Sequence, residues 1–298
     1  MSRVVLIVNP YSTGVSRRRV ADVTAAVAQR AEVVVRQTEG KGHALELAAE
    51  AAADGADALL VFSGDGTYNE AINGAAGKLP FGFLPGGGAS VFPHALGLPR
   101  DPAEAANRAI EALEAGRTKS VSLGLVNGRR FGFSAGIGLD AEAVRRVDRR
   151  GRDRDGRRAG NVVFAATVVG VLAEHRFRMA PQLELEGFGR AAFVFVANGR
   201  PYTYLGPFAV TIAGQADFQD GLDFVAPREL SPGSLPGLAL RGFRGRLADD
   251  PRVLTGHDLD SLAIRCDRPL PLQADGEDLG DVTEALFEAE RDALAVLA

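Results

Sequence analysis

The stretch ALLVFSGDGTYNE, residues 58–70, decides how this chain folds. It begins with the apolar run ALLVF, whose length and composition are typical of a buried strand. A Gly-rich turn follows directly, and from about Thr67 the pattern predicts a helix. Glycines let a backbone approach a ligand closely, and a helix N-terminus offers free N–H groups to an anion. The stretch therefore predicts a strand, a phosphate-binding turn and a helix.

Asp65 is the chemically informative residue of this turn. A carboxylate beside phosphate groups normally needs a cation, which indicates Mg²⁺ held jointly by the protein and the phosphates. The alternative interpretation is an ordinary strand-to-helix turn with an Asp cap. We favour the phosphate site, because two similar turns, NPYSTG at residues 9–14 and LPGGGAS at residues 84–90, occur in the same half of the chain.

The same alternation of strand and helix extends over the first 120 residues. Short apolar runs predict strands at residues 4–8, 33–35, 58–62 and 81–84, and the segments between them predict helices at about 16–30, 42–53, from 67, and up to 115. Such alternation is typical of a parallel sheet covered on both faces. In such a sheet the three loops lie at one edge, where they would form a nucleotide-phosphate cradle.

The pattern changes near Lys119. Short β-type runs separated by turn residues then predict an antiparallel β domain, interrupted by one helix at about 161–174. We therefore expect an α/β plus β protein of two domains. Residues 1–119 would form a nucleotide-binding α/β domain with a parallel sheet. Residues 120–298 would form an antiparallel β-sandwich, with the last residues able to pack back on the first domain.

Composition excludes several classes of protein. The 298 residues are 46% hydrophobic and 24% charged, as in globular proteins. Lys plus Arg is 34 and Asp plus Glu is 38, and this balance does not favour a nucleic-acid partner. The single cysteine, Cys266, excludes an intrachain disulfide and fits a reducing cytoplasm. The longest weakly polar run, residues 161–173, is shorter than a membrane span and predicts a buried helix.

Three further patterns were weighed for function. GIGLDA, residues 136–141, resembles a dinucleotide fingerprint but lies outside the α/β half, so we favour a tight turn entering a helix. Residues 145–158 hold eight Arg and three Asp, which predicts a solvated loop, with attraction to anionic lipid as the alternative. In QADGED, residues 273–278, the Asp-Gly-Glu turn places two carboxylates at a hairpin tip, with an ordinary polar turn as the alternative. Walker A, protein-kinase and serine-hydrolase motifs are absent from the sequence.

Taken together, the motifs resemble the diacylglycerol kinase catalytic-domain family of lipid kinases. Residues 9–14 resemble its opening Asn-Pro-x-Ser-Gly, residues 63–70 its Gly-Gly-Asp-Gly-Thr-x-Asn-Glu, and residues 84–99 its Pro-x-Gly-Thr-x-Asn segment. Residues 135–143, 220–222 and 275–277 resemble later motifs of the family, in the same order. The resemblance implies a first domain like that of NAD kinases and phosphofructokinases and a β-sandwich that binds the lipid. It also implies transfer of the ATP γ-phosphoryl group to a lipid hydroxyl.

The resemblance also implies roles for individual residues. Asp275 would be the general base, with Glu277 on the metal or supporting the base, and Asp65 would act with Mg²⁺. A structural Mg²⁺ would be held by the turn that carries Asp217, Asp220 and Leu222. ATP and its Mg²⁺ would be bound by Asn9, Ser12, Gly14, Gly64, Asp65, Gly66, Thr67, Asn69, Glu70, Gly87 and Gly88.

The implied setting is cytoplasmic, with peripheral contact between the enzyme and the inner face of the membrane where its lipid substrate lies. Family members are often dimers, so a homodimer is a further expectation. The chain departs from the family at Ser63, which replaces a Gly, and at Gly88 and Ser90, which replace Thr and Asn. These departures leave two alternatives open: a kinase of a soluble acceptor, and a nucleotide- or lipid-binding protein without catalysis.

Overall fold

The computed structural model describes residues 1–88, 90–149, 161–200, 202–205 and 208–298. The chain divides into two compact units. The first consists of Met1–Val121 with Asp292–Ala298, and the second of Ser122–Arg291. The sequence predicted a boundary between the two domains at residues 119 and 120, two residues before the first boundary in the structure. The chain passes from one unit to the other twice, and its last residues return to the first.

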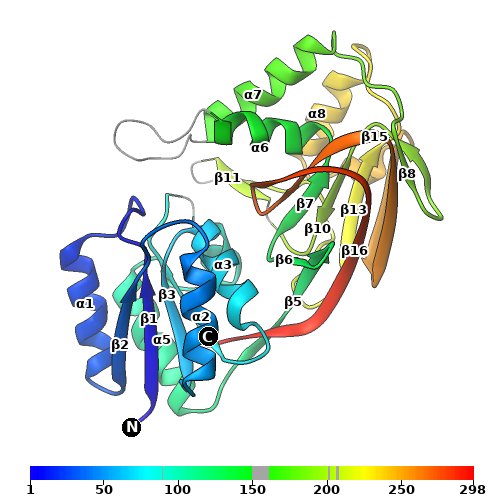
Figure 1. The fold of residues 1–298 in the computed structure, drawn as a ribbon. Coiled ribbons are helices and arrows are strands. Elements are labelled where there is room, and N and C mark those ends of the chain that lie inside the picture. Colours follow the sequence, from blue (N-terminus) through cyan, green and yellow to red (C-terminus); the bar gives the residue numbers. More distant parts are fainter. Residues whose placement is uncertain (89, 150–160, 201, 206–207) are drawn as a thin grey trace. The chain divides into compact units, whose positions relative to one another are not determined.

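The first unit is built on a parallel sheet, as the sequence predicted (Figure 1). Its strands run in the order β4-β3-β1-β2. Their bounds are β1 (Arg3–Val8), β2 (Glu32–Gln37), β3 (Ala58–Ser63) and β4 (Phe81–Pro85). Beside β4, Val296 at the end of the long strand β16 (Glu277–Val296) pairs in parallel with Phe81.

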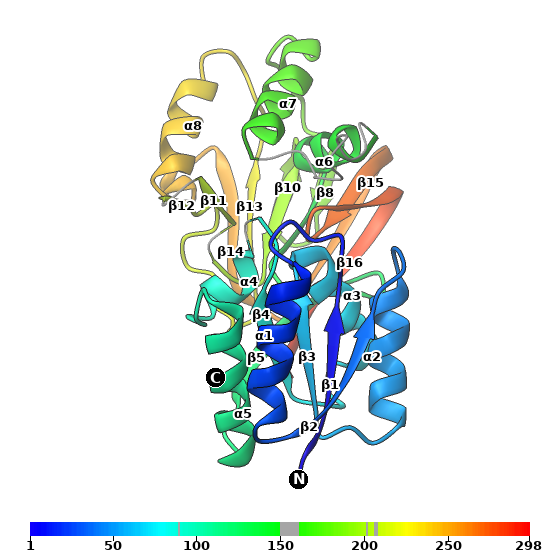
Figure 2. The ribbon, with the colours of Figure 1, turned by 90° about the vertical axis from the view of Figure 1, so that its left-hand side faces the viewer.

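Helices cover both faces of this sheet (Figure 2). Helices α1 (Arg17–Ala28) and α5 (Pro102–Glu114) lie on one face, and α2 (His43–Ala53) and α3 (Asp65–Ala75) on the other. The short helix α4 (Val91–Ala95) follows the loop after β4. Alternate strand residues supply the two faces, so Val4, Leu6 and Val8 pack with α1 and α5 in one buried cluster. Ser16 caps α1 by accepting a hydrogen bond from the Arg19 N–H, as predicted.

The second unit is rich in antiparallel strands, which confirms the predicted change of architecture. Strands β7, β10, β13 and β14 pair in succession, and β15 pairs with β7, β8 and β16. The bounds are β5 (Lys119–Val126), β6 (Arg129–Phe131), β7 (Ser134–Ile137), β8 (Leu183–Leu185), β9 (Gly189–Ala191), β10 (Val194–Ala197), β11 (Thr203–Leu205), β12 (Phe208–Val210), β13 (Leu222–Pro227), β14 (Val253–Leu259) and β15 (Ser261–Ala274). Their inward side chains form one large buried cluster that includes Phe131, Phe224 and Phe287.

The prediction of a single helix in this half was wrong. The helix α7 (Asn161–Glu174) has the predicted bounds, but α6 (Leu139–Arg149) and α8 (Leu235–Phe243) are also present. The start of α6 was predicted from the turn at residues 136–141, but its extent was missed because its Arg residues were assigned to a charged loop. Leu139, Val144 and Val147 are nevertheless buried at helical spacing. Residues 145–149 of that stretch therefore belong to a helix, and residues 150–158 lie outside the described residues. Among the described residues, no helix is long and apolar enough to cross a bilayer.

Helices α2 and α3 pack closely at Gly74. A Cβ at this position would lie 2.3 Å from the Leu45 carbonyl oxygen and 3.0 Å from the Ala48 Cβ. Both neighbours belong to α2, and the nearer one is backbone, which cannot turn away. The glycine therefore sets the distance between the two helices.

Replacing Gly74 by Ala is expected to destabilise the protein by about 1–3 kcal/mol, because the added methyl group overpacks the contact with α2. The matched control is Gly170→Ala in α7, where no atom lies within 4 Å of the added Cβ. That change should raise stability by about 0.5–1 kcal/mol through helix propensity. Denaturant unfolding followed by circular dichroism measures both variants, and equal stability of the two would contradict this account.

Candidate nucleotide site and the Asp-Gly-Glu turn

The three loops predicted to form a cradle lie together at the carboxyl edge of the first unit's sheet. The Gly14 N–H donates to the Gly86 carbonyl oxygen at 2.8 Å, which joins the loop after β1 to the loop after β4. The Gly86 N–H donates to the Ser63 carbonyl oxygen at 2.7 Å, which joins the loop after β4 to the end of β3. The sequence thus predicted correctly that these turns share one edge.

Glycines are required here because the loops touch through their backbones. A Cβ on Gly87 would lie 2.7 Å from the Gly64 Cα, and a Cβ on Gly14 would lie 2.9 Å from the Gly86 carbonyl oxygen. These distances are shorter than side chains tolerate. Gly88 differs, because the nearest atom to its Cβ would be the Thr13 Oγ1 at 3.8 Å. Its backbone is open to the surroundings, as a phosphate contact requires.

A chain of polar side chains crosses the same three loops. The Asn9 Nδ2 donates to the Thr67 Oγ1 at 3.0 Å, and the Ser63 hydroxyl donates to that same oxygen at 2.7 Å. The Ser12 and Ser63 hydroxyls lie 2.9 Å apart. Three residues predicted to bind ATP are therefore held in one network.

Ser63 is a member of this network that the sequence analysis did not select. It was noted only as a departure from the family's Gly, but it is fully buried and its hydroxyl contacts both Ser12 and Thr67. A buried hydroxyl needs partners, and these two side chains supply them. Its position as the last residue of β3, directly before the Gly-rich turn, was the signal available in the sequence.

Asp65 caps a helix, but not the helix that follows it directly. Its two carboxylate oxygens accept hydrogen bonds from the Val91 N–H at 3.1 Å and the Phe92 N–H at 3.0 Å, at the start of α4. Burial raises the pKa of Asp65 above its ordinary value, and the two N–H groups oppose that shift. The carboxylate thus fixes the loop after β4. Its contact with Mg²⁺ stays a prediction.

Asn69 and Glu70 are buried in α3, where both make intramolecular contacts. The Glu70 carboxylate accepts from the Gly42 N–H at 2.9 Å and the Ala44 N–H at 3.2 Å, at the start of α2. The Asn69 Oδ1 accepts from the Asn73 Nδ2 at 3.1 Å. These contacts give Glu70 a capping role, and the predicted contacts of both residues with ATP remain predictions.

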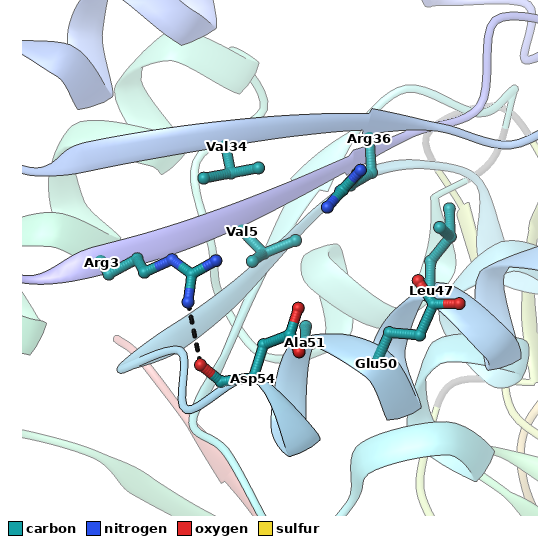
Figure 3. Close-up of a pocket in the computed structure, with 8 residues that line it drawn as sticks. All are labelled: Arg3, Val5, Val34, Arg36, Leu47, Glu50, Ala51 and Asp54. Carbon is teal, nitrogen blue, oxygen red and sulfur yellow. Dashed lines mark hydrogen bonds between the residues drawn. The ribbon is translucent and has the colours of Figure 1, made fainter.

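A small pocket in the first unit lies away from these loops, between β1, β2 and the C-terminal half of α2 (Figure 3). Arg3 donates across it to the Asp54 carbonyl oxygen at 2.9 Å. Its volume of about 10 Å³ is near that needed for one water molecule. It is therefore too small to bind a nucleotide.

In the second unit, the Asp-Gly-Glu motif forms the tip of the hairpin between β15 and β16. Asp275 and Gly276 have φ of 47° and 77°, which is typical of a two-residue type I′ turn. The Asp275 carboxylate accepts three backbone hydrogen bonds, from the N–H groups of Gly132, Phe133 and Ser134 at 2.7, 2.9 and 3.1 Å. These bonds hold the carboxylate in one position. Glu277 lies next to it, with its carboxylate 3.4 Å from Arg129.

The GIGLDA segment enters α6 through a tight turn, as predicted. Gly138 has φ of 101°, and a Cβ on Gly136 would lie 2.6 Å from an oxygen of the Asp140 carboxylate. The Gln273 side chain donates to that carboxylate at 2.9 Å and accepts from the Gly276 N–H at 2.9 Å. Gln273 therefore connects Asp140 to the Asp275 hairpin. Burial raises the pKa of Asp140 to about 6.

Two of the residues predicted to hold a structural cation, Asp217 and Asp220, lie at the turn before β13, and the third, Leu222, is the first residue of that strand. The Asp217 Oδ1 accepts from the Gln219 N–H at 3.1 Å, and the Asp217 carbonyl accepts from the Asp220 N–H. Among the described residues, no group of three or more His, Cys, Asp or Glu side chains forms a metal cluster. The predicted set needs only two carboxylates and the Leu222 carbonyl, and such oxygen ligands suit Mg²⁺. It stays a prediction.

Comparison with known proteins supports the resemblance over the first part of the chain. Residues 3–126, which contain the three loops, match the model of the diacylglycerol kinase catalytic domain. This first part of the chain is similar to the diacylglycerol kinase catalytic domain. The resemblance inferred from the sequence motifs is thereby confirmed.

Relatives of the chain carry names from the same family. It is 34% identical over 144 residues to the diacylglycerol kinase of Bacillus subtilis, covering 46% of each chain. It is 31% identical over 158 residues to the diacylglycerol kinase of Mycobacterium tuberculosis, covering 50% of each. The chain thus spans about half the length of these curated relatives.

The fold is shared over a longer range. The crystal structure of a diacylglycerol kinase from Bacillus anthracis superposes with a TM-score of 0.73 at 20% sequence identity, covering 99% of this chain and 96% of that one. At this identity the likeness concerns the fold. The matched residues include both the α/β unit and the antiparallel unit.

The two adjacent glycines of the loop after β4 should respond differently to the same substitution. Gly87→Ala is expected to weaken nucleotide binding about tenfold or more and to lower the thermal unfolding midpoint, because its methyl group would separate this loop from Gly64. Gly88→Ala, with open space around it, should leave the unfolding midpoint unchanged. Calorimetric titration with ATP and a thermal melt measure both effects. Equal unfolding midpoints for the two variants would contradict the close backbone contact between Gly87 and Gly64.

Asp140 should make stability depend on pH. Its pKa is about 6 in the folded protein against an ordinary value of 3.8, so the folded state takes up the proton first as the pH falls. The contribution of Asp140 to the free energy of unfolding therefore grows as the pH falls from about 7 to about 4. It is lost as the pH rises through 6. Unfolding of Asp140→Asn should lack this slope, while the exposed control Asp22→Asn should keep it. If Asp140→Asn kept the same dependence of stability on pH, another titrating group would be its cause.

Proposed function

We propose that this protein is an ATP- and Mg²⁺-dependent lipid kinase that transfers the γ-phosphoryl group of ATP to the hydroxyl of diacylglycerol or a related lipid alcohol. The observation that carries the proposal is the cradle of three loops, in which backbone contacts between glycines and a network of hydroxyl groups meet at one sheet edge. The match to the family model supports phosphoryl transfer as the type of reaction. The names of the relatives support the lipid acceptor.

The first unit would bind the nucleotide. Asn9, Ser12 and Thr67 are held by one another and by Ser63, so their polar groups are positioned before ATP arrives. The backbone N–H groups of Gly64, Gly66 and Gly88 would contact the phosphates, since Gly-rich turns offer such groups to anions. Asp65 would contact Mg²⁺ through the lone pairs that remain on its two oxygens, since a carboxylate has about four acceptor positions. The bound ion would neutralise charge on the phosphates.

The second unit would provide the base. Asp275 would accept the proton of the lipid hydroxyl as that oxygen forms its bond to the γ-phosphorus. The bond from the γ-phosphorus to the oxygen that bridges to the β-phosphate breaks, and its electrons leave with ADP. Phosphoryl transfer depends mainly on positioning and charge neutralisation. Three backbone hydrogen bonds to Asp275 supply the positioning on this side.

The remaining roles follow the same proposal. Glu277, adjacent to the base, would support it or contact the metal. The turn of Asp217, Asp220 and Leu222 would hold a second, structural Mg²⁺ that fixes the start of β13. A lipid acceptor would place the enzyme at the cytoplasmic face of the membrane, and the family suggests a homodimer. Nucleic acid is not a partner in this proposal.

The test uses purified full-length protein, γ-labelled ATP, Mg²⁺ and diacylglycerol in detergent micelles. Label should appear in the lipid phase. Asp275→Asn should lower kcat by about 10²–10⁴-fold, the usual contribution of a general base, while the Kd for ATP stays unchanged. The matched control is Asp22→Asn, an exposed residue of α1 that should retain full activity.

Three other outcomes would overturn the proposal or part of it. Label in a water-soluble product would identify a kinase of a soluble acceptor. ATP binding without transfer to any lipid of a mixed extract would identify a protein without catalysis. Full activity in Asp275→Asn would remove Asp275 from the role of base while leaving the kinase itself intact.

A further inference from the structure

Helix α7 presents an apolar surface to solvent. Residues 161–173 contain no charged side chain. Thr167, Val171 and Leu172 point inward and are buried. The outward positions are apolar, with Val163 37% and Val169 56% exposed and Ala165, Ala166, Gly170 and Ala173 also exposed. A surface helix normally places polar residues on its outward face, so this face is suited to an apolar partner.

Neighbouring elements extend the apolar surface. Leu240 on α8 is 52% exposed, and Phe177, just after α7, is 38% exposed. Val171 and Leu172 of α7 share one buried cluster with Leu238 of α8. Figures 1 and 2 show α7 and α8 at the same end of the second unit. The exposed apolar side chains therefore lie over a common core.

A cationic pocket lies at the C-terminal end of α7. Its volume is about 130 Å³, and it is lined by His175, Arg178, Met179, Ala180, Gln182 and Arg268. Arg268 donates to the Gln182 side chain at 3.0 Å. Across the described part of the chain, neither Arg178 nor Arg268 forms an ion pair, whereas nearby Arg146 and Arg190 pair with Glu174 and Asp267. The pocket thus presents two guanidinium groups that form no ion pair with the described residues.

The backbone between the helix and the pocket is strained. Arg176 and Phe177 have φ of 53° and 57°, in the left-handed region that favours glycine. The turn is closed by hydrogen bonds from the Arg176 and Phe177 N–H groups to the Ala173 and Leu172 carbonyl oxygens. The site therefore retains a cation and an aromatic ring where glycines would be less strained, which points to a role for those side chains.

We propose that the outward face of α7, with Phe177 and Leu240, docks on a bilayer that contains anionic phospholipids, and that Arg178 and Arg268 bind a lipid phosphate. An anionic bilayer presents acyl chains beneath a layer of phosphates, which matches an apolar helix face beside a cationic pocket. The whole chain carries a net charge of −4, so its attraction to such a surface must come from a local group of cations. The proposal goes beyond the kinase activity, and docking does not require catalysis.

The test measures flotation of the full-length protein with vesicles, without ATP. Wild-type protein should bind phosphatidylcholine vesicles that contain phosphatidylglycerol more tightly than vesicles of phosphatidylcholine alone. The double variant Arg178→Gln/Arg268→Gln should weaken binding to the anionic vesicles about thirtyfold, since two basic residues are removed. The charge-matched control is Arg108→Gln/Arg117→Gln, two exposed residues of the first unit, which should bind like wild type.

A second pair of variants tests the apolar contact. Val169→Ser/Leu240→Ser should weaken binding to both kinds of vesicle, and the weakening should persist at high salt, because it does not depend on charge. The control Leu286→Ser, at a side chain 44% exposed on β16, should bind like wild type. Thermal melts of every variant show whether each is folded.

Several results would overturn the proposal. One is equal binding of wild type to neutral and anionic vesicles, and another is unchanged binding by the Arg178/Arg268 variant. A third is inorganic phosphate binding in the pocket without any vesicle binding, which would assign the site to a free anion. A fourth is a wild-type dimer that Val169→Ser/Leu240→Ser converts to monomer in the absence of vesicle binding. Loss of vesicle binding with retained kinase activity in micelles would leave the proposed function standing.

Discussion

The contact between the backbones of Gly64 and Gly87 determines much of the first unit. It brings the loop after β3 against the loop after β4 at a distance that admits no side chain. The hydrogen bond from Gly14 to Gly86 adds the loop after β1. Because these loops are stabilised by one another, the edge of the sheet is organised before any ligand binds. Such preorganisation lowers the cost of binding, since the loops lose little freedom when the ligand arrives.

The acidic residues of this edge take part in the same organisation. Asp65 holds the start of α4, and Glu70 holds the start of α2. Each carboxylate therefore contributes to the fold, whatever it contributes to catalysis. In the second unit, Asp275 behaves similarly, because its three N–H partners come from the two residues between β6 and β7 and from the first residue of β7. Substituting such residues changes structure and chemistry together, so binding and turnover have to be measured separately.

The α/β half could be predicted element by element, because each strand is an uninterrupted apolar run and each helix follows a capping or Gly-rich signal. The elements of the second half were harder to predict from the sequence. Strand β16 extends over Glu277–Val296, yet its charged residues gave no apolar run to recognise. Its buried positions, such as Ala285 and Phe287, alternate with exposed ones only over short distances. The contact of Ser63 with Ser12 was also beyond sequence analysis, since it joins residues 51 positions apart.

The path of β16 has a consequence for how the protein is made. Residues 292–298 belong to the first unit, and Val296 pairs with Phe81, more than 200 residues earlier in the chain. The α/β sheet therefore lacks one edge pairing until the whole second unit has been synthesised. An emerging chain would carry that edge uncovered through most of translation, when exposed strand edges are most prone to aggregate. Folding of the first unit is thus completed last, although its sequence comes first.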